Sequence, residues 1–118
     1  MSSCIFCKII NKEIPTQIVF ENEKILAFKD VAPQAPIHIL FVPKKHIKNL
    51  EDCGTEDFLW MGDFFSAIQQ VSRQLDVAAN GYRCVINTNS EGGQSVYHLH
   101  IHLMAGKQMG AHMTGGDS

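Results

Sequence analysis

The sequence predicts an α+β fold, a five-stranded antiparallel sheet with one short and one long helix. Three observations support it: short alternating segments typical of strands, one long apolar stripe at helical spacing, and turn residues between them. The length of 118 residues suits one domain with a single core. We expect this domain to span residues 1–118, with 1–3 as an N-terminal extension and about 105–118 as an irregular tail.

The predicted strands are separated by recognisable turn and loop signals. Asn22-Glu23 reads as a turn, residues 30–36 form a loop because two prolines forbid regular pairing, and Asn80-Gly81 is another turn. The expected strands are residues 17–21, 24–29, 37–42, 82–87 and 96–104.

Two segments have helical spacing. Residues 5–11 read as a short helix, and residues 55 to about 75 as a long one that Thr55 caps. The long helix has an apolar stripe. Further apolar residues widen it and indicate a subunit contact. The stripe contains Phe58, Met61, Phe65, Ile68, Val71 or Ser72, and Leu75, and the residues that widen it are Leu59, Trp60 and Phe64.

Composition excludes several classes of function. The formal net charge of −2 excludes nucleic acid held by bulk electrostatics. The longest apolar run, 37–42, is far shorter than the roughly 20 residues of a membrane span, so we expect no membrane partner. The N-terminus lacks an export signal, which indicates reduced thiols and a cytoplasmic location, with the nucleus as a second compartment. Cys84, in an apolar stretch, is expected in the core.

Three of the six histidines, His98, His100 and His102, alternate with apolar residues. On a strand all three imidazoles share one face, about 6.6 Å apart at ~3.3 Å per residue. They could chelate a catalytic metal, or one could be a nucleophile. The preceding loop, 87–95, offers glycine-permitted backbone N–H groups and neutral side-chain donors, which suit a phosphate and favour the nucleophile.

Several motifs together resemble those of the histidine-triad (HIT) family, within it most closely the nucleotide-binding proteins of the phosphoramidase branch. They span residues 4 to about 106. The matching stretches are IFCKII (5–10), EIP (13–15), AFKD (27–30), PQAPIH (33–38), PKKHI (43–47), GGQSVYH (92–98) and HLHIHLM (98–104).

The resemblance implies a homodimer in which two five-stranded sheets join. It also implies that the chain binds purine nucleoside monophosphates and hydrolyses the P–N bond of nucleoside 5′-phosphoramidates, such as adenylylated lysine or other amines. His100 resembles the nucleophile, His102 and His38 its supporting network, and Ser95 the donor to the leaving amine. A neutral imidazole is nucleophilic at pH 7, and a nucleotidyl-imidazole intermediate divides one hard step into two easier ones.

The resemblance also implies the nucleotide-binding residues. Asp30 resembles the acceptor for the ribose hydroxyls, although an aspartate in a proline-rich loop is also typical of a turn cap. The phosphate is expected at Asn87, Gly93, Gln94 and Val96. The base pocket is expected to contain Ile5, Phe6, Ile9, Ile14, Phe28 and Val31.

Cys4 and Cys7 form a Cys-x-x-Cys pair, a half-site for zinc or a redox couple. In some HIT relatives this pair belongs to a metal site that two histidines complete. The resemblance implies His46 and His98 for that role here. Such a closed tetrahedral zinc is structural, so we expect no catalytic cofactor.

Three alternative functions remain. The chain could hydrolyse dinucleoside polyphosphates, which needs the same nucleophile and a different leaving group. It could be a nucleotide-binding regulatory module with little turnover. It could also be a metal-dependent enzyme that uses His98, His100 and His102 as ligands.

Overall fold

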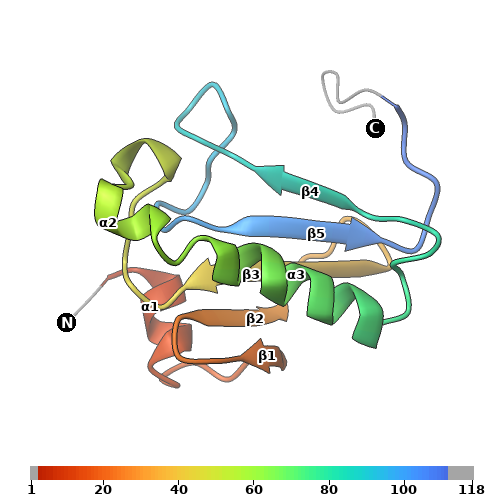
Figure 1. Cartoon of the computed structure of the whole chain (residues 1–118), viewed down its shortest axis with the longest axis horizontal. Coiled ribbons are helices and arrows are strands. Elements are labelled where there is room, and N and C mark those ends of the chain that lie inside the picture. The colour runs from red at the N-terminus through yellow and green to blue at the C-terminus, as the bar shows by residue number, and fades with distance from the viewer. Residues whose placement is uncertain (1–2, 112–118) are drawn as a thin grey trace.

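The computed structural model describes residues 3–111 and confirms the α+β fold with a five-stranded antiparallel sheet (Figure 1). The sheet order is β1-β2-β3-β5-β4, so β1 and β4 are its two edges. The strands are β1 (Ile18–Glu21), β2 (Ile25–Lys29), β3 (Ile37–Pro43), β4 (Arg83–Ile86) and β5 (Ile101–Ala105).

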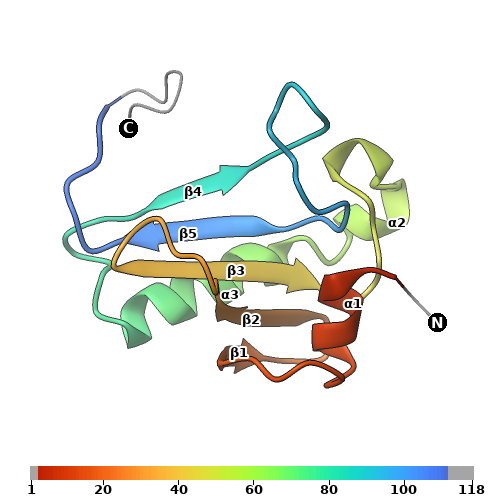
Figure 2. The ribbon, with the colours of Figure 1, turned by 180° about the vertical axis from the view of Figure 1, so that it is seen from behind.

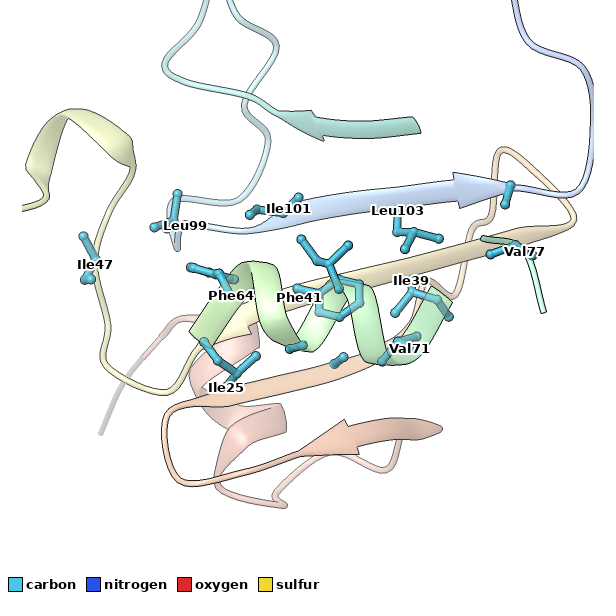
Figure 3. Packing of buried hydrophobic residues seen from close by; sticks show 14 residues of the cluster. Ile25, Ile39, Phe41, Ile47, Phe64, Val71, Val77, Leu99, Ile101 and Leu103 are labelled. Carbon is cyan, nitrogen blue, oxygen red and sulfur yellow. The ribbon is translucent and has the colours of Figure 1, made fainter. Parts of the chain in front are cut away.

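The central strands are buried on both faces, because a helix packs on each side of the sheet. Ile25 and Phe41 face α3 (Gly62–Gln74), where Phe64 and Val71 complete the larger core (Figure 3). The alternate residues of β2 and β3 face α1 (Ile5–Ile10) and form a smaller cluster with Phe6. Figure 2 shows α1 on the face of the sheet opposite α3.

The predicted single helix over residues 55–75 is wrong, because the segment forms two helices. A 3₁₀ turn, η1 (Leu50–Asp52), precedes α2 (Thr55–Phe58), and α3 begins only at Gly62. Between α2 and α3 the backbone bonds join residues three apart, as in Trp60 N–H to the Asp57 carbonyl at 3.3 Å, so the chain is wound more tightly there.

This break changes which side chains reach the core. Phe64 is 1% exposed, whereas Phe65, which the apolar stripe placed inside, is 64% exposed. The predicted cap differs too: Gly54 occupies the cap position, and its N–H donates to the Asp57 carboxylate at 2.8 Å. Asp57 is in turn held by Lys45, with Nζ 2.7 Å from Oδ1.

Strand β5 is shorter than the predicted strand over 96–104. Its partner β3 ends at Pro43, which has no N–H to donate, so the regular ladder begins at Ile101 opposite Phe41. The N–H of Leu99 donates instead to the Ile47 carbonyl at 2.7 Å. The direction of the side chains still alternates, because Leu99, Ile101 and Leu103 all lie in the core under α3.

The edge strand β4 corrects the expectation for Cys84. This cysteine is exposed rather than in the core, because α3 lies over β2 and β3 and leaves β4 uncovered (Figure 1). The irregular tail starts after Ala105, the last residue of β5. The predicted extension and tail fall partly outside the described residues, at 1–2 and 112–118. Within 3–111, no helix is long and apolar enough to cross a membrane.

Candidate active site and metal centre

His38 on β3 and His102 on β5 lie on neighbouring strands and share a hydrogen bond. Their Nε2 and Nδ1 atoms are 2.9 Å apart, and the backbone N–H of Gln34 donates to Nδ1 of His38 at 3.0 Å. Since Nδ1 of His38 accepts, its proton is on Nε2, which donates to Nδ1 of His102. The neutral His102 ring therefore carries its own proton on Nε2.

His100 has the opposite tautomer. Its Nδ1 lies 2.8 Å from the carbonyl oxygen of His98, and a carbonyl can only accept, so Nδ1 carries the proton. Nε2 is then left with a lone pair. The ring is 4% exposed and is fixed by edge-to-face contacts with Phe6 at 5.1 Å and His102 at 4.9 Å between centroids.

His98 points to a different neighbourhood, the start of α1. Its Nε2 donates to the Pro43 carbonyl at 2.9 Å, so Nδ1 has the lone pair. That Nδ1 lies 3.4 Å from Sγ of Cys4, 3.6 Å from Sγ of Cys7 and 3.1 Å from Nδ1 of His46. The structure thus brings together the four predicted metal ligands, with donor atoms all within 4.8 Å of one another.

These four donors fit a tetrahedral zinc ion. Bond lengths of ~2.3 Å to sulfur and ~2.0 Å to nitrogen put the donors of such a site roughly 3.3–3.8 Å apart. The separations between donor atoms in this cluster, including 3.2 Å between Sγ of Cys7 and Nδ1 of His46, are close to that range. The hydrogen bond from His98 to Pro43 is the kind of outer contact that orients a ligating imidazole.

Burial lowers the pKa values of three histidines, His38, His98 and His102, and favours their neutral forms. Desolvation lowers the pKa of His102 to about 4, and the neighbouring His100 and His38 rings add to the effect. Desolvation also lowers the pKa of His38, against the opposing charge of Asp30. In His98, burial lowers the pKa to about 4. A neutral His98 suits metal binding, and neutral His38 and His102 suit the hydrogen bond that they share.

A cavity of about 210 Å³ lies beside the histidine pair. Its walls contain His38 and His102 from the sheet and three residues of the loop over 87–95. Those loop residues are Asn87, Gly93 and Ser95. His100 does not line this cavity.

Two glycines shape that loop. A Cβ on Gly92 would lie 2.4 Å from the Thr88 carbonyl oxygen, and Gly93 has a φ of +77°. Only glycine meets both requirements without strain. The side-chain amide of Asn87 donates to the Gly92 carbonyl at 2.7 Å and closes the loop.

Gln94 is built into the loop rather than into the cavity wall. It is 7% exposed, its amide nitrogen donates to the Lys48 carbonyl at 2.9 Å, and its backbone N–H donates to the Asn89 carbonyl at 3.0 Å. Gln94 is one of the residues expected at the phosphate, but its side-chain amide nitrogen and its backbone N–H are both already used inside the protein. Its amide oxygen accepts from the Asn89 N–H at 2.9 Å.

The residues expected around the base divide into two groups. Phe6, Ile9 and Phe28 are buried in the cluster between α1 and the sheet, and Ile14 packs against it. Val96, which is expected at the phosphate, packs against the same cluster. Ile5 and Val31 lie at the surface, 47% and 93% exposed.

Asp30 faces in two directions. Its Oδ1 accepts from the Ala32 N–H at 2.8 Å, the turn cap considered from the sequence. Its Oδ2 lies 3.5 Å from Nε2 of His38.

Sequence reasoning missed four participants. Met104 and Val85 line the cavity. The sequence held a signal for Met104, which continues the period of two that places the histidines on one face, whereas Val85 pairs with His102 in a register that only the structure shows. Gln34 and Pro43 act through backbone groups that orient His38 and His98. Their side-chain types gave no signal for such roles.

Comparisons with known proteins agree with this architecture. The HIT domain family model matches residues 11–109. The purine nucleoside phosphoramidase of Escherichia coli K12 is 42% identical over 106 residues, which is 90% of this chain and 89% of that protein. An uncharacterized HIT-like protein of Synechococcus elongatus is 49% identical over 105 residues, 89% of this chain and 91% of that protein.

Solved structures give the same result. A histidine triad protein from Clostridium difficile superposes with a TM-score of 0.91 at 40% identity, covering 96% of this chain and 98% of that one. The histidine triad nucleotide-binding protein of Candida albicans has a TM-score of 0.79 at 30% identity, over 95% and 86% of the two chains. With its alternating histidines on one face of the same sheet, the chain belongs to the HIT domain family and is a hydrolase of that family.

Proposed function

We propose that this chain binds purine nucleotides and hydrolyses the P–N bond of nucleoside 5′-phosphoramidates, such as adenylylated lysine or other amines, through a covalent nucleotidyl-histidine. The relative from Escherichia coli named purine nucleoside phosphoramidase supports this substrate class. The name of the Candida albicans structure supports nucleotide binding.

The observation that carries the proposal is the tautomer of His100. Its Nδ1–H is committed to the His98 carbonyl at 2.8 Å, so the nitrogen at the other end of the ring has the lone pair. A ring held in this state needs no separate base before it attacks phosphorus.

The reaction balances in two steps. The Nε2 lone pair of His100 forms a bond to phosphorus as the P–N bond to the amine breaks, and the amine nitrogen takes a proton delivered through Ser95. Water then attacks the same phosphorus, the bond to Nε2 breaks, and the nucleoside monophosphate leaves. Solvent supplies the proton that Ser95 relays to the amine, and the proton released by the attacking water returns to solvent. His102 and His38 stay neutral and hold the site through their shared hydrogen bond.

The rest of the site supplies the nucleotide contacts. We place the phosphate against the loop with Asn87, Gly93 and the backbone of Val96, and the purine against Phe6, Ile9 and Phe28, with Ile5, Ile14 and Val31 at the pocket's rim. Asp30 accepts from the ribose hydroxyls through Oδ2, because Oδ1 is used by the turn. The role of Gln94 is to build the loop.

Zinc is the metal proposed at Cys4, Cys7, His46 and His98, because the donor set and its spacing fit it. A closed site with two sulfur and two nitrogen ligands stabilises structure and leaves no open position for a substrate. We therefore assign no catalytic cofactor. The alternative in which His98, His100 and His102 hold one catalytic metal is disfavoured, since Nδ1 of His98 faces His46 while Nδ1 of His102 faces His38.

We also propose a homodimer. Ile86 and Cys84 of the uncovered edge strand β4 are exposed on the face that α3 occupies, and Phe65 of α3 is 64% exposed. An open strand edge beside apolar side chains is a surface that a partner usually covers. We place the protein in the cytoplasm, with the nucleus as a second compartment, since Cys53 and Cys84 are thiols. We propose no nucleic-acid partner because the net charge is −2, and no membrane partner because the longest apolar run is only 37–42.

One comparison of substrates tests the activity. We expect turnover of adenosine 5′-phosphoramidate to exceed that of a diadenosine polyphosphate, and His100→Ala to abolish turnover while AMP still binds. Acid-quenched reactions of the wild type should trap a nucleotidyl adduct on His100. Near-normal turnover of the His100→Ala variant would refute the nucleophile. Faster polyphosphate cleavage would favour the related hydrolase, and binding with no turnover of either compound would favour the regulatory module.

A further inference from the structure

We propose that the metal centre and the nucleotide pocket are energetically coupled through α1, with Phe6 as the positioning residue that connects them. This inference rests on the proposed function. It assigns to the metal a task beyond holding the N-terminal segment, namely setting the affinity of the pocket for its nucleotide.

The first observation is the position of Phe6 between the two cysteines. Cys4 is the N-cap of α1 and Cys7 lies in its first turn, where the Cys7 N–H donates to Sγ of Cys4 at 3.4 Å. Phe6 therefore belongs to the same turn of chain that both sulfur ligands hold. Any movement of that turn moves the Phe6 ring.

The second observation is what the Phe6 ring touches. It makes edge-to-face contacts with three rings, and each belongs to a different part of the site. The centroids lie 5.9 Å from His98, the metal ligand, 5.1 Å from His100, the nucleophile, and 5.6 Å from Phe28 of the base pocket. Phe6 is itself 6% exposed, so these contacts fill a packed space.

A second link runs through the backbone. The His98 ring is held from both sides, by Pro43 at Nε2 and by the metal ligands at Nδ1. The carbonyl of the same residue accepts the Nδ1–H of His100 at 2.8 Å. The ligand that completes the metal centre thus also orients the nucleophile.

The attachment of α1 explains why the metal matters for its position. The helix has six residues, and only Phe6 and Ile9 are buried. A helix this short is marginal by itself and depends on its contacts with the sheet. Removing the metal leaves the two buried side chains as its main anchor, so α1 should open locally more often than the sheet does.

Coupling of this kind is reciprocal, and this makes it measurable without turnover. If metal binding strengthens AMP binding by some factor, AMP must strengthen metal binding by the same factor. Typical coupling between two sites in one protein is about 5- to 150-fold, and for sites joined by one packed ring we expect the lower end, roughly five- to tenfold.

The test uses the full chain, loaded with Zn²⁺ or stripped by a chelator. We expect calorimetry to show AMP binding five- to tenfold weaker after stripping, and Zn²⁺ binding tighter by the same factor in saturating AMP. Hydrogen exchange should accelerate at the amides of α1 in the stripped protein and stay slow in α3. Three results would each overturn the coupling. They are equal AMP affinities of the loaded and stripped protein while both ligands bind, loss of protection from hydrogen exchange throughout the protein, and no Zn²⁺ binding.

Two variants separate the coupling from general loosening of α1. Phe6→Leu keeps both cysteines and should still bind Zn²⁺, but the ratio between loaded and stripped AMP affinities should fall toward one. Ile10→Ala removes apolar packing from the same helix and the same cluster without a ring contact to either histidine, and should keep the wild-type ratio. Equal ratios in the two variants would contradict the role of Phe6. Failure of AMP to bind in every form would count against the proposed function instead.

Discussion

His38 and His102, 64 positions apart in sequence, are joined by one hydrogen bond of 2.9 Å that determines the tautomer of both rings. Because the Gln34 N–H occupies Nδ1 of His38, the proton between the rings belongs to His38 and the outer proton of His102 lies on Nε2. The direction of these two donors is the basis of the first prediction.

Nitrogen NMR should show His102 as the Nε2–H tautomer in the wild type. In His38→Ala, Nδ1 of His102 loses its hydrogen-bond donor. We expect denaturant titration to show a folded state that is less stable by about 1–3 kcal/mol. His38→Gln, whose amide can still donate, should recover part of that loss. A wild-type His102 protonated at Nδ1 would contradict this arrangement.

Acid should destabilise the protein in a defined window. The pKa values of His102 and His38 in the folded state are below the ordinary 6.5. As the pH falls, the unfolded chain therefore binds protons at these rings before the folded chain does. Their contribution is fully present above about pH 6.5 and is lost as the pH falls toward 4. We expect His102 alone to account for about 1–2 kcal/mol, after allowance for its partly exposed ring.

Denaturant titrations at fixed metal content and several pH values measure this slope. His102→Asn should be less sensitive between pH 6.5 and 4.5 than the wild type. Glu21 and Asp57, whose pKa values are lowered by lysine partners, act in a separate window below about pH 4.5. Equal slopes for the variant and the wild type would show that His102 is not the group responsible.

Gly92→Ala should damage the loop over the cavity. Its Cβ would meet the Thr88 carbonyl at 2.4 Å, so the backbone must shift, and we expect AMP affinity to fall at least tenfold. Gly62→Ala is the matched control, since a Cβ there meets nothing within 4 Å and alanine favours a helix. Calorimetry and thermal unfolding of both variants check this. Normal AMP binding by Gly92→Ala would exclude the loop from the phosphate site.

The oligomeric state should depend on the edge at β4 and not on the edge at β1. Ile86→Lys and Phe65→Lys place charges in the apolar surface, so sedimentation should show a dimer reduced to a monomer. Ile18→Lys, at the opposite edge and 39% exposed, should stay dimeric. A monomeric wild type, or dimers in all three variants, would place the contact elsewhere or remove it.

Among the cysteines, only Cys4 and Cys7 should affect the zinc content. Protein purified without chelator should hold about one zinc per chain, and Cys4→Ser should lose most of it, since one of four ligands is replaced by a weaker one. Cys53→Ser, outside the cluster, should keep the wild-type content by elemental analysis. If the wild type holds less than one zinc per chain and Cys4→Ser leaves that content unchanged, the proposed metal site is refuted.

Local patterns predicted most of the fold. The order of the five strands along the chain, the short first helix and the shared direction of His98, His100 and His102 follow from spacing and turn residues, which act over a few residues. The prediction of one long helix failed because the chain is wound more tightly at residues 59–61. The spacing of apolar residues does not reveal that change. Phe64 rather than Phe65 is therefore buried, and Cys84 is exposed because β4 lies beyond α3.

The amino-acid sequence by itself determined which side chains share a face, since a period of two is a property of an extended chain. Only the tertiary structure decided what each histidine does. His98 and His102 meet partners far away in the sequence, such as Cys4, 94 positions before His98, and His38, 64 positions before His102. A ring nitrogen is a donor, a nucleophile or a ligand according to the atom that meets its other nitrogen, and folding alone brings that atom into place.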